Sequence, residues 1–170
     1  MSIAEILSIT VPLIAVILSY ICGRLETFGR SKTEAIKEQY EKFYIPFLQK
    51  LCIILPDENI KFSDMSFEMR SIFFDIVMRN IQYIDINTQH RIPNFYRAYV
   101  DMLEYADGNP KYAETPSYAD IAFINLAICA CRQSIKLSKK LHFPKIGAAV
   151  LPNLLKQQHA LQQAQAQKVN

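Results

Sequence analysis

Near its start the chain has a run of eighteen residues without a charged side chain, from Ile6 to Gly23, directly followed by Arg24. As an α-helix this run would be roughly 27 Å long, close to the hydrocarbon thickness of a bilayer, about 30 Å. A secretory signal would carry Lys or Arg before the apolar stretch and a small-x-small cleavage site after it, whereas only Glu5 precedes this one. The run therefore predicts a retained transmembrane helix over residues 1–24; the alternative is a buried core helix.

The basic residues around this run indicate its orientation. No Lys or Arg precedes Arg24, and several follow it closely: Arg24, Arg30, Lys32, Lys37 and Lys42. Because Lys and Arg are retained on the cytoplasmic side of a membrane, we expect the N-terminus of this single-pass protein to lie outside. Everything after Arg24 is then expected in the cytoplasm.

Five small residues within the run are regularly spaced. They follow one another at intervals of 4, 3, 4 and 3, and they are Ser8, Pro12, Ala15, Ser19 and Cys22. This spacing places them in one stripe on a helix, and small residues let transmembrane helices pack closely in lipid. The stripe, called the seam below, predicts self-association of the spans, and several copies could enclose a pore. The alternative is that the small residues align by chance.

After the span, the sequence predicts an all-α fold. Only 4 of its 170 residues are glycine, and 51% are hydrophobic, which favours a folded domain over a disordered one. Apolar residues recur three and four positions apart. We expect a bundle of four or five helices, with helices over about 32–55, 66–84, 91–106 and 115–141.

Local signals set the ends of these helices. Ser31-x-x-Glu34 is typical of a capping box at the first of them, and Pro46 should bend that helix. Its apolar face comprises Ile36, Tyr40, Phe43, Phe47, Leu51 and Leu55. Thr115 is expected as the N-cap of the fourth helix, with Pro116 as its first residue.

Burial can be expected from the same patterns. The segment 66–84 should be the most buried surface helix because its apolar arc is broad. Residues 121–131 hold one polar side chain, Asn125, and should form the central bundle helix, since eleven residues are too few to cross a bilayer. The packing face of 91–106 is expected to comprise Phe95, Tyr96, Tyr99, Val100 and Leu103.

The end of the chain should differ from the bundle at 25–145. Residues 146–170 predict a short helix beginning between Ile146 and Asn153, with Pro152 favouring the later start. A Gln-rich segment without an apolar face follows, so we expect a frayed helix or a disordered tail.

Charge is unevenly distributed between two segments. Residues 57–120 contain 11 acidic and 6 basic residues, whereas residues 132–170 contain 7 basic residues and no acidic one. The candidates for contact with RNA or anionic lipid are Arg132, Lys136, Lys139, Lys140 and Lys145. The alternative is a solvated face whose lysines complement a helix C-terminus.

Motifs for catalysis are missing from the sequence. His90, His142 and His159 are isolated, and no zinc-protease motif, phosphate loop or nucleophile elbow occurs. The cysteines Cys22, Cys52, Cys129 and Cys131 sit among apolar residues, which favours reduced structural thiols. We therefore predict no catalytic residue, no metal and no cofactor, and we favour a protein that is not an enzyme.

A resemblance adds to this interpretation. The N-out span, the basic boundary and the helix YEKFYIPFLQKL, Tyr40 to Leu51, are similar to small single-pass membrane proteins of bacteria and prophages. The layout resembles the accessory protein of type VI-B CRISPR systems, which has a divergent HEPN domain and forms a ring-like membrane pore. The resemblance implies a bacterial inner or plasma membrane location, antiviral defence, and as partners the membrane, further copies, and RNA or an RNA-guided effector complex.

HEPN ribonucleases carry an Arg followed after four to six residues by a His on one helix. Arg79 precedes His90 by 11 positions and Arg132 precedes His142 by 10. Neither pair fits, so the resemblance implies a non-catalytic bundle. Two hypotheses follow: a self-associating membrane effector that perturbs the membrane, and a membrane-tethered RNA-binding or HEPN-type ribonuclease domain.

Overall fold

The computed structural model describes residues 19, 24, 29–54 and 61–169. Two units are distinguished, with the boundary between Lys37 and Glu38, and each is described by itself. The predicted span and most of the seam, namely Ser8, Pro12, Ala15 and Cys22, lie outside the described residues. Ser19 is helical and exposed.

The described part of the first unit is helical over residues 29–37. The capping box expected at Ser31 is wrong, because Gly29 and Arg30 are already helical. The hydroxyl of Thr33 donates instead to the carbonyl oxygen of Gly29, at 3.0 Å, as Thr does inside a helix. The helix thus begins before Ser31 and includes Gly29.

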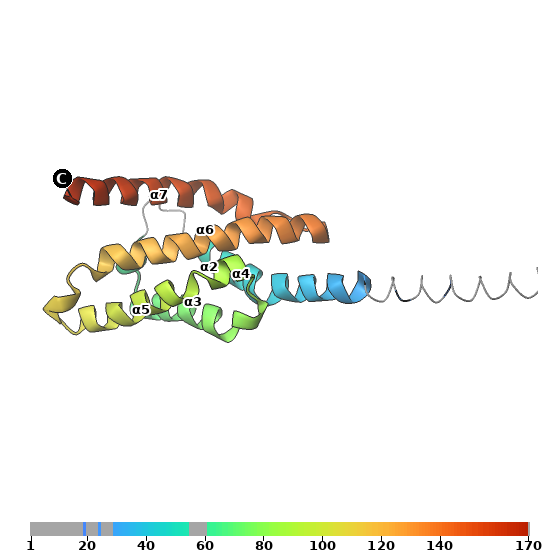
Figure 1. Cartoon of the computed structure of the whole chain (residues 1–170), viewed down its shortest axis with the longest axis horizontal. Coiled ribbons are helices and arrows are strands. Elements are labelled where there is room, and N and C mark those ends of the chain that lie inside the picture. Colours follow the sequence, from blue (N-terminus) through green and yellow to red (C-terminus); the bar gives the residue numbers. More distant parts are fainter. Residues whose placement is uncertain (1–18, 20–23, 25–28, 55–60, 170) are drawn as a thin grey trace, which may run out of the picture. The chain divides into compact units, whose positions relative to one another are not determined.

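The second unit consists of helices and short turns (Figure 1), and no strand occurs in the ranges given above. A π-helical turn, Tyr40–Tyr44, leads into the first helix of the unit. The helices are α2 (Ile45–Ile54), α3 (Phe67–Arg79), α4 (Ile86–Gln89), α5 (Ile92–Ala106), α6 (Thr115–Leu141) and α7 (Ile146–Val169). The 3-10 turns are Phe62–Asp64, Ile81–Tyr83 and Pro110–Tyr112. The prediction of an all-α fold is confirmed.

The π turn before α2 has a cause in the sequence. Pro46 has no amide hydrogen, so it cannot donate to the carbonyl four residues earlier. The helix widens just before this position, where the amide of Ile45 donates to the carbonyl of Tyr40. The side chains of Tyr40, Phe43 and Phe47 are fully buried, as predicted for this face.

The helix α6 is the central one, as the sequence predicted. It contacts α4, α5, α7 and the turns before α2 and α3, and fourteen of its residues are buried. In the described part of the chain it is the one helix long and apolar enough to cross a membrane, but 61% of its most apolar stretch is buried within the protein. Thr115 is its first residue rather than its N-cap, which is Glu114.

Five phenylalanines meet at the centre of the bundle. The ring centre of Phe123 in α6 lies 4.8 Å from that of Phe62, and these two rings are stacked. It lies 4.9 Å from the ring centre of Phe73, which it meets edge to face. The rings of Phe47 and Phe95 are within 6.4 Å and 6.1 Å of it. This cluster joins α2, α3, α5 and α6, so it is the core of the unit.

The segment 66–84 differs from the prediction in length and burial. Ser66 caps α3 by accepting from the amide of Met69, but the helix ends at Arg79, and a 3-10 turn follows. Only two residues of α3 are buried, Phe73 and Val77. The expectation of the most buried surface helix is wrong, since α3 packs against α2 and α5 on one side.

The C-terminal prediction is correct for the range in which the helix begins, but wrong for its length and for the frayed or disordered tail. The helix α7 begins at Ile146 and continues to Val169 with Pro152 inside it, and it lies along α6 (Figure 1). Val150, Leu154 and Gln157 are buried, so residues three and four apart do form a contact face. The segment 146–169 therefore packs as a helix against α6 and α2.

A glycine allows α7 to approach α6 closely. A Cβ atom on Gly147 would lie 2.7 Å from the carbonyl oxygen of Cys131 and still nearer to the Ser134 hydroxyl. The hydroxyl of Ser134 itself donates to that carbonyl, at 2.8 Å. The backbone of one helix thus rests directly on the backbone of the other.

We expect Gly147→Ala to lower the free energy of unfolding by about 1–3 kcal/mol, because the added methyl group overpacks this crossing. The higher helix propensity of alanine, about 1 kcal/mol, offsets only part of that loss. Chemical unfolding of the full chain, followed by circular dichroism, measures the change. Gly29→Ala is the matched control: Gly29 is helical with nothing within 4 Å of an added Cβ, so an equal loss there would contradict the assignment.

Candidate functional site

Four of the predicted contact residues share one exposed face of α6. Arg132, Lys136, Lys139 and Lys140 follow one another at spacings of 4, 3 and 1, which places them within one arc of the helix. The buried residues of the same stretch, including Cys131, Ser134 and Ser138, lie on the opposite side. Because the buried side packs against the bundle, the basic side chains are directed to solvent.

The fifth residue, Lys145, lies in the exposed connection between α6 and α7. We call these five residues the basic face: Arg132, Lys136, Lys139, Lys140 and Lys145. Phe143, which is 36% exposed, lies in the same connection. The face therefore offers several cations beside one aromatic ring.

The alternative interpretation, a helix-capping role, accounts for part of the face. Lys139 and Lys140 lie in the last turn of α6, where cations stabilise the carbonyl end of a helix. His142 follows in the left-handed conformation. The amide of Phe143 then donates to the carbonyl oxygen of Ser138, at 2.9 Å, which ends the helix. Arg132 and Lys136 lie further from that end, where the helix dipole has little effect.

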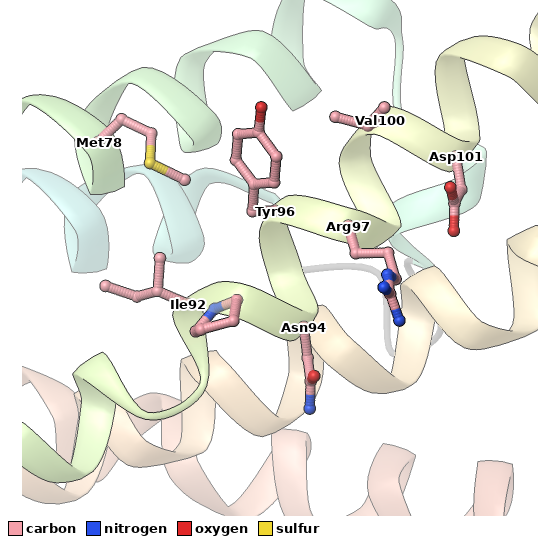
Figure 2. A pocket seen from close by; sticks show the side chains of 8 residues that line it. Met78, Ile92, Asn94, Tyr96, Arg97, Val100 and Asp101 are labelled. Carbon is pink, nitrogen blue, oxygen red and sulfur yellow. The ribbon is translucent and has the colours of Figure 1, made fainter.

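A groove that the sequence did not predict lies beside α5 (Figure 2). Its volume is about 670 Å³, and residues of α3 and α5 line it. Figure 2 shows Tyr96 and Val100 on one side of α5, with Asn94, Arg97 and Asp101 along another side of the same helix. Tyr96 and Val100, with Leu103 one turn further on, are 51%, 37% and 37% exposed.

This exposure corrects the packing face expected for 91–106. Phe95 and Tyr99 are buried as predicted, but Tyr96, Val100 and Leu103 are exposed. The buried stripe of α5 consists of Ile92, Phe95, Ala98, Tyr99 and Met102. The apolar arc of α5 is wider than its contact with the bundle. The width of that arc was the feature of the sequence that indicated an exposed apolar surface.

Two buried polar clusters join elements of the bundle. The carboxylate of Asp120 is 3% exposed and accepts from the amide and the hydroxyl of Ser63, at 2.8 and 3.2 Å. Burial raises the pKa of Asp120, and the Ser63 hydrogen bonds act in the opposite direction. These bonds attach the 3-10 turn before α3 to α6, which is a structural role.

The second cluster is built around Tyr44. Its hydroxyl donates to a carboxylate oxygen of Asp85, at 2.8 Å, and accepts from the Asp85 amide, at 3.2 Å. The same carboxylate caps α4 by accepting from the amide of Asn87, at 3.0 Å. Burial raises the pKa of the Tyr44 hydroxyl, so this group remains a neutral donor that connects the π-helical turn before α2 to the N-cap of α4.

The two Arg–His pairs compared with the HEPN motif, Arg132 with His142 and Arg79 with His90, do not form a common site. Arg132 and His142 are ten residues apart along and just beyond α6, roughly 15 Å by helical rise. Arg79 pairs with Asp75, at 3.1 Å, and His90 ends the short helix α4. Among the described residues, no group of three His, Cys, Asp or Glu could hold a metal ion.

The cysteines differ in their surroundings. Cys131 is buried, as predicted, and burial raises the pKa of its thiol to about 12, with Cys52 acting in the same direction. Cys52 is exposed, which contradicts the expectation of an apolar environment. Cys129 is partly exposed, and Cys22 lies outside the described residues.

No protein-family model, curated protein or solved structure matches the chain. A function can therefore be inferred only from features of this chain. They are the uncharged run at its start, the basic face of α6 and the exposed apolar side of α5.

Proposed function

We propose that the protein is a membrane-anchored, self-associating accessory or effector protein of bacterial antiviral defence that forms an oligomeric pore. The observation that carries this proposal is the uncharged run from Ile6 to Gly23 with basic residues only after it. Such a run prefers lipid to water, and its flanking charges favour a cytoplasmic bundle. The resemblance of the layout to type VI-B CRISPR accessory proteins, with their HEPN-like bundle, supports the context of defence.

The proposed mechanism is association of the bundles, which brings the spans together in the membrane. Each copy contributes one transmembrane helix, so a pore requires several copies. The seam residues, among them Ala15 and Ser19, allow neighbouring spans to approach closely, because contact between helices in lipid depends on close packing. The basic residues that follow the span, including the exposed Arg30, Lys32 and Lys37, favour the cytoplasmic leaflet.

The basic face supports a second candidate, a membrane-tethered RNA-binding domain. Arg132, Lys136, Lys139 and Lys140 present four cations on one exposed arc, and cations at such spacing can contact successive phosphates. RNA or an RNA-guided effector complex would then be the partner. A HEPN-type nuclease activity is disfavoured, since Arg132 and His142 are roughly 15 Å apart.

Reconstitution of the full chain into dye-filled vesicles tests the proposal. We expect the wild-type protein to release the dye, and we expect Ala15→Leu combined with Ser19→Leu to abolish release, because bulky side chains separate the spans. The matched control is Ile14→Leu with Ile17→Leu, which changes the lipid-facing side and should leave release unchanged.

Absence of leakage, together with a monomer in detergent, would contradict the proposal. Labelled RNA is added to the same preparation. RNA binding that weakens steeply with salt, without leakage, would favour the second candidate.

A further inference from the structure

The acidic residues at the end of α5 do not stabilise that helix. Glu104 lies in its last turn and Asp107 is its C-cap, and no basic residue occurs in that turn. Because the carbonyl end of a helix carries partial negative charge, carboxylates there reduce its stability. A positive partner outside the helix would stabilise these carboxylates; within the copy, Lys111 lies in the 3-10 turn that follows α5.

These acidic residues share a face with the exposed apolar stripe of α5. Tyr96, Val100, Leu103 and Asp107 follow one another at spacings of 4, 3 and 4, and Glu104 is adjacent to them. We call this set the acidic apolar face: Tyr96, Val100, Leu103, Glu104 and Asp107, all of them exposed. An aromatic and apolar centre bordered by charges is the usual composition of a protein-protein interface.

The basic face is too distant to neutralise these carboxylates within one copy. The last turn of α5 leads through a short connection to the start of α6 at Thr115 (Figure 1), whereas the basic face begins at Arg132. Seventeen residues of α-helix separate the two, roughly 25 Å, while charges in physiological salt are screened beyond about 8 Å. The two faces can therefore meet only between different molecules.

We propose that the acidic apolar face of α5 in one copy binds the basic face of α6 in the next copy. The carboxylates of Glu104 and Asp107 pair with the cations around Lys136 and Lys139, and the exposed Phe143 beside the basic face packs on the apolar stripe. The two surfaces in this contact are different, so each copy keeps one of each available. A contact of this kind builds a ring when the rotation closes.

This inference deepens the proposed function and rests on it for one step. Copies anchored in one membrane with the same orientation are related by an axis perpendicular to it, and rings of more than two such copies need contacts between two different surfaces. The contact described here has that property. It supplies the association of the bundles that the proposed pore requires.

Charge reversal on each face tests the contact. The first variant carries Glu104→Lys and Asp107→Lys, and the second carries Lys136→Glu and Lys139→Glu. All four residues are exposed, so the helical circular dichroism spectrum should be unchanged. The mass of the full chain in detergent is measured by light scattering, at about 0.1 M salt and at about 1 M salt, where the screening length is about 3 Å.

We expect the wild-type chain to form a multimer at the lower salt and each reversed variant to lose it. Mixing the two variants should restore the multimer, because the basic α6 of the first meets the acidic α5 of the second, and the two reversed faces also match. The matched control is Glu68→Lys with Lys156→Glu, two exposed charges on α3 and α7, which should leave the multimer intact.

Three results would overturn the inference: a multimer in either reversed variant, no restoration on mixing, or a wild-type monomer. Dye release in vesicles separates this failure from that of the proposed function. If the reversed variants still form a multimer and release the dye, the proposed pore is retained but its copies associate through another contact. If mixing the variants restores the multimer but no preparation releases the dye, the contact is retained and only the pore is rejected.

Discussion

Replacing Phe123 with alanine is expected to lower the free energy of unfolding by about 3–5 kcal/mol. The ring is 3% exposed and lies within 4.9 Å of the rings of Phe62 and Phe73. Its removal leaves a cavity where α2, α3, α5 and α6 meet, and the surrounding rings can fill only part of it. Denaturant unfolding of the full chain, followed by circular dichroism, measures the loss.

Phe67→Ala is the control for this change. Phe67 begins α3 and is 56% exposed, so the same truncation should change stability by no more than about 0.5 kcal/mol. A comparable loss at the two positions would mean that Phe123 is not at the centre of the core. The difference between the two variants, rather than either value alone, therefore tests the fold.

The sequence predicted helices well where strong local signals mark their ends. The helix α5 begins with a proline in its first turn and ends before Gly108, whose φ of +80° few other residues adopt. The helix α6 likewise starts at Thr115-Pro116 and ends before Pro144. These residues determine backbone conformation by themselves, so their effect does not depend on the rest of the fold.

Prediction failed where tertiary contacts decide the outcome. The helix α7 has no continuous apolar face, yet Gly147 lets its backbone rest on α6, and its Gln158 amide donates to the Asn125 side chain, at 2.6 Å. The apolar arc of α3 is similar to that of a buried helix, although α3 lies at an edge of the bundle. Neither packing partner can be identified from local periodicity.

The candidate surfaces were predictable to different degrees. The residues of the basic face were identified from the absence of acidic residues after position 132, and helical spacing then places four of them together. The apolar side of α5 was assigned to the core instead. Tyr96 and Leu103 are residue types that are common in cores. They are exposed because the contact between α5 and its neighbours is too narrow to cover them.

Charges placed inside the proposed span should release the protein from the membrane. A lysine at the centre of a transmembrane helix costs about 2.5–3.5 kcal/mol on insertion, so Ile14→Lys with Ile17→Lys should cost roughly twice that amount. The matched control adds the same charges on the cytoplasmic side, as Ser31→Lys with Ala35→Lys, where both residues are exposed and helical. The control should remain membrane-bound.

The most direct measurement is the fraction of full-length protein that stays in the membrane pellet after a wash in alkaline carbonate. We predict that the wild-type chain and the Ser31→Lys, Ala35→Lys control stay almost entirely in the pellet, and that the Ile14→Lys, Ile17→Lys variant appears in the supernatant. A wild-type chain recovered in the supernatant would contradict the membrane anchor, and with it the proposed pore.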